Sequence, residues 1–82
     1  MNWQATTTDK VISKKIGEHI LWGWVKIYAD NNSRQRVSAV VFFNGDSPVE
    51  SRQKTFDNVD EATAWTECVF NELAREASWQ TL

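Results

Sequence analysis

The sequence predicts an α+β fold, in which a three-stranded antiparallel sheet carries a C-terminal helix on one face. Three segments rich in β-branched and aromatic residues are separated by short turn-forming segments, as is typical of antiparallel strands. After residue 58 the apolar residues recur every three or four positions, which is the spacing of an amphipathic helix. The chain has 82 residues, enough for one small domain. We expect a single domain with an N-terminal segment over 1–17, a sheet over 20–56 and a helix over 59–78.

The N-terminal segment allows two interpretations. In the first, Thr8 caps a short helix that carries Val11, Ile12 and Ile16 near one side and ends at Gly17. In the second, residues 10–15 are extended. The sequence does not choose between them.

The three predicted strands cover residues 20–29, 36–43 and 49–56. Residues 30–33 and 44–48 separate them, and both connections consist of Asp, Asn, Ser, Gly and Pro, the residues that favour turns. The third strand is the most polar, so we place it at an edge of the sheet.

The helix begins with a clear capping pattern. Asn58 is a favourable N-cap residue, and Glu61 follows three positions later, as in a capping box. One apolar stripe then follows at helical spacing: Ala62, Trp65, Val69, Leu73 and Ala77. The opposite side carries an acidic flank, which is a secondary candidate binding surface: Glu67, Glu72 and Glu76.

Alternation along the strands divides the sheet into an odd-numbered and an even-numbered face. The odd face is almost purely aliphatic and is predicted to lie under the helix: Leu21, Gly23, Val25, Ile27, Val37, Ala39, Val41, Phe43 and Val49. Small residues at Gly23, Ala39 and Ser51 would form a hollow, and Trp65 is predicted to fill it. Trp65→Ala would then cost about 3–5 kcal/mol of stability.

The even face is the candidate partner-binding surface, because one helix cannot cover both sides of a sheet. Its aromatic and basic residues include Trp, Tyr and Arg, the types most enriched in binding hot spots: Trp22, Trp24, Lys26, Tyr28, Arg36, Phe42, Arg52 and Lys54. Left in water, such a patch would reach a size that usually marks an interaction site. Three alternatives stay open: the N-terminal segment covers this face, a second copy covers it in a homodimer, or a functional partner binds it.

Recognisable catalytic chemistry is missing from the sequence. His19 is the one histidine and has no evident catalytic partner, and no phosphate-binding loop or nucleophile motif occurs. Cys68 is the one cysteine, so no disulfide can form within the chain, and its place beside the apolar stripe predicts a small buried side chain. We expect no enzyme activity, no cofactor and no metal site.

Charge and hydropathy bear on the partner and the compartment. The formal net charge is −2, which argues against strong nonspecific binding of nucleic acid. No run approaches ~18 apolar residues, so no membrane span is expected. The N-terminus resembles no secretion signal and the lone cysteine fits a reducing compartment, so we expect a cytoplasmic protein.

The segment KTFDNVDEATAW, from Lys54 to Trp65, resembles a strand-to-helix junction found in two families. The first is the AP2-type DNA-binding domain with the related arm-binding domain of phage integrases, which residues 22–27 (WGWVKI) also resemble. That resemblance implies DNA binding through the sheet face opposite the helix. The residues facing DNA would be Lys26, Arg36, Arg52 and Lys54, together with Trp22 and Trp24.

The same junction, the size and the acidic balance are similar to those of small phage-encoded anti-CRISPR inhibitor proteins. This resemblance implies a stand-alone protein that occludes a surface of a larger complex in the host cytoplasm. The first functional hypothesis is therefore a non-enzymatic protein-binding module, an inhibitor from a phage or other mobile element. Its partner would be a larger protein or ribonucleoprotein complex. The alternative is a sheet-face nucleic-acid binder of the AP2 or integrase-arm type.

Overall fold

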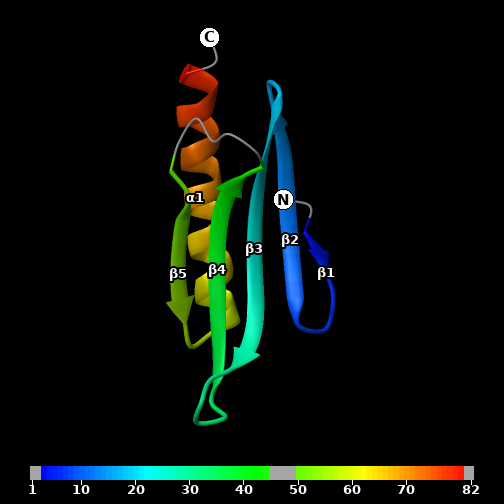
Figure 1. Cartoon of the computed structure of the whole chain (residues 1–82), viewed down its shortest axis with the longest axis vertical. Helices are drawn as coiled ribbons and strands as arrows, with labels where there is room; N and C mark the ends of the chain where they lie inside the picture. The colour runs from blue at the N-terminus through cyan, green and yellow to red at the C-terminus, as the bar shows by residue number, and fades with distance from the viewer. Residues whose placement is uncertain (1–2, 45–49, 81–82) are drawn as a thin grey trace.

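The computed structural model describes residues 3–44 and 50–80 of the chain. Its strands, in chain order, form one five-stranded antiparallel sheet with one helix packed on a single face (Figure 1). The elements are β1 (Gln4–Ala5), β2 (Asp9–Ile16), β3 (His19–Ala29), β4 (Gln35–Phe43), β5 (Arg52–Phe56) and α1 (Val59–Gln80). The α+β class and the C-terminal helix are confirmed, while the sheet has five strands instead of the predicted three.

The N-terminal helix is not formed, and the extended interpretation of residues 10–15 is the correct one. β2 pairs with β3 along its whole length, from Asp9 opposite Lys26 to Ile16 opposite His19. Gly17 has φ 61° and lies in the two-residue turn that joins these strands, where a positive φ at the first position is typical of a type II′ turn. The glycine therefore closes a hairpin instead of ending a helix.

The loop between β3 and β4 is organised by one carboxylate. Oδ1 of Asp30 accepts hydrogen bonds from the backbone N–H groups of Asn32 and Arg34, both at 2.9 Å. Ser33 adopts a left-handed φ of 61° in this loop. The residues predicted to form this turn therefore do so, and β3 and β4 lie where the sequence places them.

The pairing of β5 with β4 differs from the simple register expected from the sequence. Val37, Ala39 and Val41 of β4 lie opposite Phe56, Lys54 and Arg52 of β5. Residues directly opposite each other in an antiparallel pair point to the same face, so the even residues of β5 share a face with the odd residues of β4. The predicted contribution of Val49 to the odd face lies outside the described residues.

The helix covers the odd face of β3 and β4, as predicted. Leu21, Val25, Val37, Ala39 and Val41 are all buried against it. Asn58 caps the start of the helix, as predicted. Its Oδ1 accepts hydrogen bonds from the backbone N–H groups of Asp60 at 2.7 Å and of Glu61 at 3.2 Å. The helix extends to Gln80, two residues beyond its predicted end.

The buried stripe of the helix includes Ala62, Leu73 and Ala77 as predicted, but Thr66 and Phe70 are buried where Trp65 and Val69 were expected. Thr66 is fully buried and Phe70 is nearly so. Thr66 can enter the core because its hydroxyl group donates a hydrogen bond to the Ala62 carbonyl at 2.7 Å. A Cβ added to Gly23 would lie 3.0 Å from carbon atoms of both Ile12 and Thr66 and 3.3 Å from the Phe70 ring. These three side chains therefore occupy the space above Gly23.

Trp65 does not fill that hollow, and this prediction is wrong. Its half-buried ring lies at the margin of the core, 5.7 Å from the ring centroid of Phe56. Ser51 lies outside β5, so the expected row of small residues is not assembled. The loss expected for Trp65→Ala is accordingly smaller than the full-burial value given above.

Trp3 ties the N-terminal strand to the helix. Its indole N–H donates to Oε1 of Glu67 at 2.9 Å, and the Lys10 ammonium lies 4.9 Å from the centroid of its ring. Trp3 also packs against both parts of the core. The N-terminal segment thus extends the sheet sideways and closes the edge of the core instead of folding over the other face.

Candidate functional site

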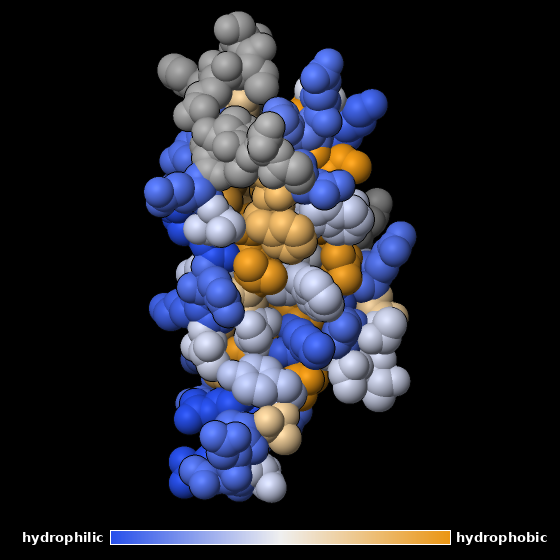
Figure 2. Space-filling model, in the orientation of Figure 1, coloured by the Kyte–Doolittle hydropathy of each residue, from blue (hydrophilic) through white to orange (hydrophobic). Residues whose placement is uncertain are grey.

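The sheet has a second face that no described element covers, and we call it the open face. It consists of the side chains opposite α1: Gln4, Asp9, Val11, Ser13, Lys15, Ile20, Trp22, Trp24, Lys26, Tyr28, Arg36, Ser38, Val40, Phe42, Gln53 and Thr55. Figure 2 shows this face, with apolar and aromatic side chains along its middle and polar ones at its margins.

The centre of the open face is a row of paired residues that crosses the sheet. Val11, Trp24, Val40 and Gln53 lie side by side on β2 to β5. Trp22 and Phe42 form the next row toward one end. Strand pairing therefore gathers these side chains into one continuous patch, although they come from separate parts of the chain.

Two large side chains of this patch remain well exposed. Trp24 is 37% exposed and Tyr28 is 38% exposed, which sets them apart from the other large apolar residues in the described part of the chain. A flat indole and a phenol on a rigid strand can bury much area on binding and lose little conformational entropy. They are the two side chains best placed to anchor a partner.

The cations of the open face are partly neutralised. Arg36 lies between two carboxylates: its Nε is 3.4 Å from Oδ2 of Asp30, and its Nη1 pairs with Asp57. Hydrogen bonding to Asp30 and the charge of Asp57 raise the pKa of Arg36, while the backbone N–H of Arg34 is the main cause that lowers the pKa of Asp30. Arg36 therefore acts first as a structural link between the β3–β4 loop and the start of the helix.

Two predicted site residues are not on the open face. The register of β5 directs Arg52 and Lys54 to the helix side of the sheet. There Lys54 holds its ammonium 5.3 Å from the ring centroid of Phe56, and Arg52 donates to the Glu50 carbonyl at 3.3 Å. The other six predicted residues, namely Trp22, Trp24, Lys26, Tyr28, Arg36 and Phe42, are brought together as expected.

The open face also has members that the sequence interpretation missed. Val11, Ser13 and Lys15 join it through β2, and Ile20 lies opposite Lys15 on β3. Ile12 and Ile16 are four positions apart, a spacing that places them on one side of either a helix or a strand. The Gly17-Glu18 pair between two apolar segments was the available signal for a hairpin.

The acidic flank of the helix is only partly free. Glu67 accepts the hydrogen bond from Trp3, so it contributes to the fold, while Glu72 and Glu76 are exposed. Cys68 is exposed as well, which corrects the expectation that it is buried. Two exposed carboxylates alone do not define a recognition site.

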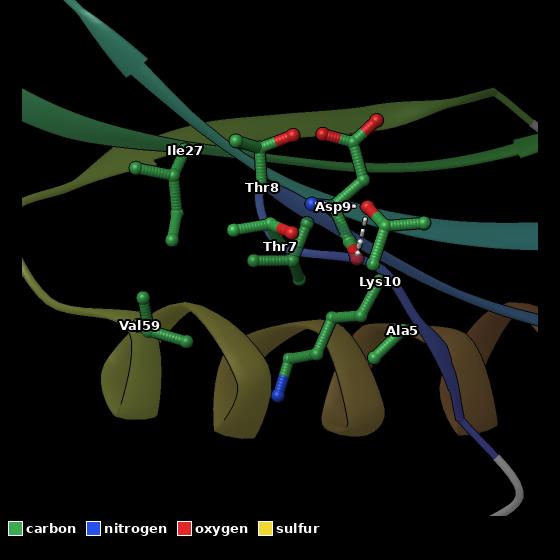
Figure 3. Close-up of a pocket in the computed structure, with 9 residues that line it drawn as sticks. Ala5, Thr7, Thr8, Asp9, Lys10, Ile27 and Val59 are labelled. Carbon is green, nitrogen blue, oxygen red and sulfur yellow. Dashed lines mark hydrogen bonds between the residues drawn. The ribbon is translucent and has the colours of Figure 1, made fainter.

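A small cavity lies on the helix side, between the β1–β2 turn and the start of α1 (Figure 3). It measures about 120 Å³ and its walls are mainly aliphatic and threonine side chains: Ala5, Thr6, Thr7, Thr8, Asp9, Lys10, Val25, Ile27 and Val59. Ligand pockets usually measure ~300–1,000 Å³. This cavity has room for a single small side chain and lies apart from the open face.

The described residues offer no cluster of three or more His, Cys, Asp or Glu side chains suited to a metal ion. His19 packs its ring edge-to-face against Phe43 at 6.2 Å between centroids. Within the same residues, α1 is too polar to cross a membrane. No protein-family model, curated protein or solved structure matches this chain.

Proposed function

We propose that this chain is a non-enzymatic protein-binding module that uses the open face to occlude a surface of a larger protein or ribonucleoprotein complex. The observation that carries the proposal is the aromatic patch centred on Trp24 and Tyr28, which stays exposed on a rigid sheet. A fold of this size commonly hides such side chains. Trp and Tyr are among the residues that contribute most to binding when a partner covers them.

The charges of the open face favour a protein partner over nucleic acid. Arg36 is already paired with two carboxylates, and Asp9 lies opposite Lys26 in the β2–β3 pairing. Arg52 and Lys54, which a nucleic-acid site would need, point to the other side of the sheet. Binding to phosphates depends on many unneutralised cations, and few are available here.

The resemblance to anti-CRISPR inhibitors supports a more specific version of the proposal. A small, slightly acidic module with a flat aromatic face is suited to cover a partner surface in the host cytoplasm and block it. We therefore propose inhibition by occlusion, with the chain encoded by a phage or another mobile element.

The test compares matched double variants in a quantitative pull-down from nuclease-treated bacterial lysate. Trp24→Ala with Tyr28→Ala removes the exposed aromatics, while Arg52→Ala with Lys54→Ala alters the opposite side of the sheet. The proposal expects the first pair to abolish capture of a discrete protein and the second to retain it. Circular dichroism of each variant confirms that the fold is kept.

Three outcomes would contradict the proposal. Equal capture by both double variants would show that the open face is not used. Capture that is lost after nuclease treatment would favour nucleic acid. So would a steep dependence on salt, in which the slope of log affinity against log salt concentration is about −1 for each phosphate contacted. Loss of capture only in Glu72→Gln with Glu76→Gln would move the binding surface to the acidic flank.

A further inference from the structure

The open face has the properties of a surface that pairs with itself. One side of the sheet is closed by α1, while the other presents apolar side chains that nothing in the described part of the chain covers. We propose that, in the absence of another partner, two copies of the chain bury their open faces against each other in a two-fold symmetric dimer. This inference rests on the proposed function only in so far as both use the open face.

The size of the open face suits a small interface. From Ile20 to Tyr28 a strand advances about 26 Å, and neighbouring strands are ~4.8 Å apart. With three long strands and the shorter β5, the face measures on the order of 450 Å². That value is below the ~600–1,000 Å² that each partner buries in a standard-sized interface. A dimer of this size would be weak enough for a better-fitting partner to displace it.

The charges of the open face balance, so two copies do not repel each other as wholes. Lys15, Lys26 and Arg36 contribute three positive charges. Asp9, together with the two carboxylates paired with Arg36, contributes three negative ones. A neutral face with an apolar centre is the chemistry expected of an isologous interface.

Charge also selects between the two symmetric ways of stacking the faces. With the two-fold axis parallel to β3, Lys26 faces Lys26 of the second copy, which is unfavourable. When the axis runs along the row of Val11, Trp24 and Val40, each other row of the first copy faces a different row of the second copy. The two facing rows lie at equal distances on opposite sides of the axis in their own chains. Lys26 then faces Trp22 of the second copy, a favourable cation–π pair. The geometry points to this second arrangement.

The first experiment is sedimentation velocity of the full chain over a dilution series up to about 100 µM, well above the micromolar constants of weak standard-sized interfaces. We expect a reversible monomer–dimer equilibrium. Trp24→Lys would place two like charges together on the axis and should leave only monomer. The exposed helix residue Asn71, changed to Lys, is the matched control and should leave the equilibrium unchanged. A monomeric wild-type chain at the highest concentration would overturn the proposal.

A second variant tests the arrangement itself. Lys26→Gln removes two cation–π pairs per dimer and should raise the dissociation constant by at least about fivefold. With the axis parallel to β3, the same change would relieve repulsion and tighten the dimer. Tighter association of Lys26→Gln would therefore overturn the proposed axis. This variant changes an exposed side chain and leaves the core untouched.

The dimer and the proposed function fail in different ways. If the wild-type chain is monomeric but the Trp24→Ala, Tyr28→Ala pair still loses its captured protein, the dimer is wrong and the binding function stands. If Trp24→Lys abolishes the dimer while the double variant retains capture, the dimer stands and the function belongs to another surface.

Discussion

Gly23 is a residue at which side chains of the helix and of β2 pack directly against the backbone of the sheet. Carbon atoms of Ile12 and Thr66 lie 3.0 Å from where its Cβ would be. Ala has the better propensity for a strand, yet we expect Gly23→Ala to lower the free energy of unfolding by about 1–3 kcal/mol because the site is already filled. Urea unfolding measures this change.

The control for Gly23 removes one of the atoms that the new methyl group would meet. Thr66→Ser deletes the Cγ2 atom and keeps the hydroxyl group that bonds the Ala62 carbonyl. In a double-mutant cycle, Gly23→Ala should cost less in the Thr66→Ser background than alone. An alanine at position 23 that leaves the wild-type chain equally stable would show that the helix does not pack this closely.

Asp30 gives the β3–β4 loop a dependence on pH. Its pKa in the folded chain is lowered below the ordinary value of 3.8, mainly by the Arg34 N–H. The ionised form is therefore bound more tightly in the folded state, so its stabilisation is present above pH 3.8 and is lost as the pH falls through the lowered value. Asp30→Asn should be less stable than wild type at neutral pH, and the difference should disappear in acid.

Denaturant unfolding at a series of pH values measures that difference. A constant gap between wild type and Asp30→Asn down to the most acidic condition would contradict the assigned role of the carboxylate. Asp57→Asn is an informative comparison, because Asp57 also pairs with Arg36 but lies next to the N-cap residue of the helix, outside the β3–β4 loop.

At the scale of single elements, the sequence predicts best those elements whose structure depends on residues close by in the chain. Asn58 caps α1 as expected because the bonds of an N-cap are made within three residues. β3 and β4 lie where their composition and flanking turns place them.

The helix N-terminus allows a direct check of this local control. Asn58→Ala should lower the free energy of unfolding by about 1 kcal/mol, measured by thermal or urea unfolding, and Asn58→Ser should lower it much less. Equal losses would contradict the capping role.

Elements that depend on distant contacts were predicted less well. The spacing of Ile12 and Ile16 fits a helix and a strand equally, and only pairing with β3 makes residues 9–16 a strand. The face of Arg52 and Lys54 depends on the register of β5, which the sequence between β4 and β5 does not determine. Thr66 was missed as a core residue because a threonine in a helix is ordinarily taken as polar, although its hydroxyl bonds the preceding turn.

At the scale of the whole molecule, the sheet separates two chemically different surfaces. Residues 59–80 contain five acidic residues and one basic residue, Arg75, so the helix itself is acidic, while Lys10, Lys14, Arg52 and Lys54 add positive charge to the same side of the sheet. The open face is close to neutral and has an aromatic centre (Figure 2). The sequence predicted the aromatic half of this surface from strand alternation, but its outline required the pairing of β2 and β5. That outline identifies Trp24 and Tyr28 as its exposed anchors.

The most direct test of the open face as the binding surface is methyl NMR of the chain with and without the protein captured in the pull-down. The expected result is that signals of Val11, Ile20 and Val40 shift or broaden on binding, while those of Val59 and Val69 on the helix side do not. Perturbation confined to the helix-side methyl groups would contradict the assignment of the open face and place the partner against α1.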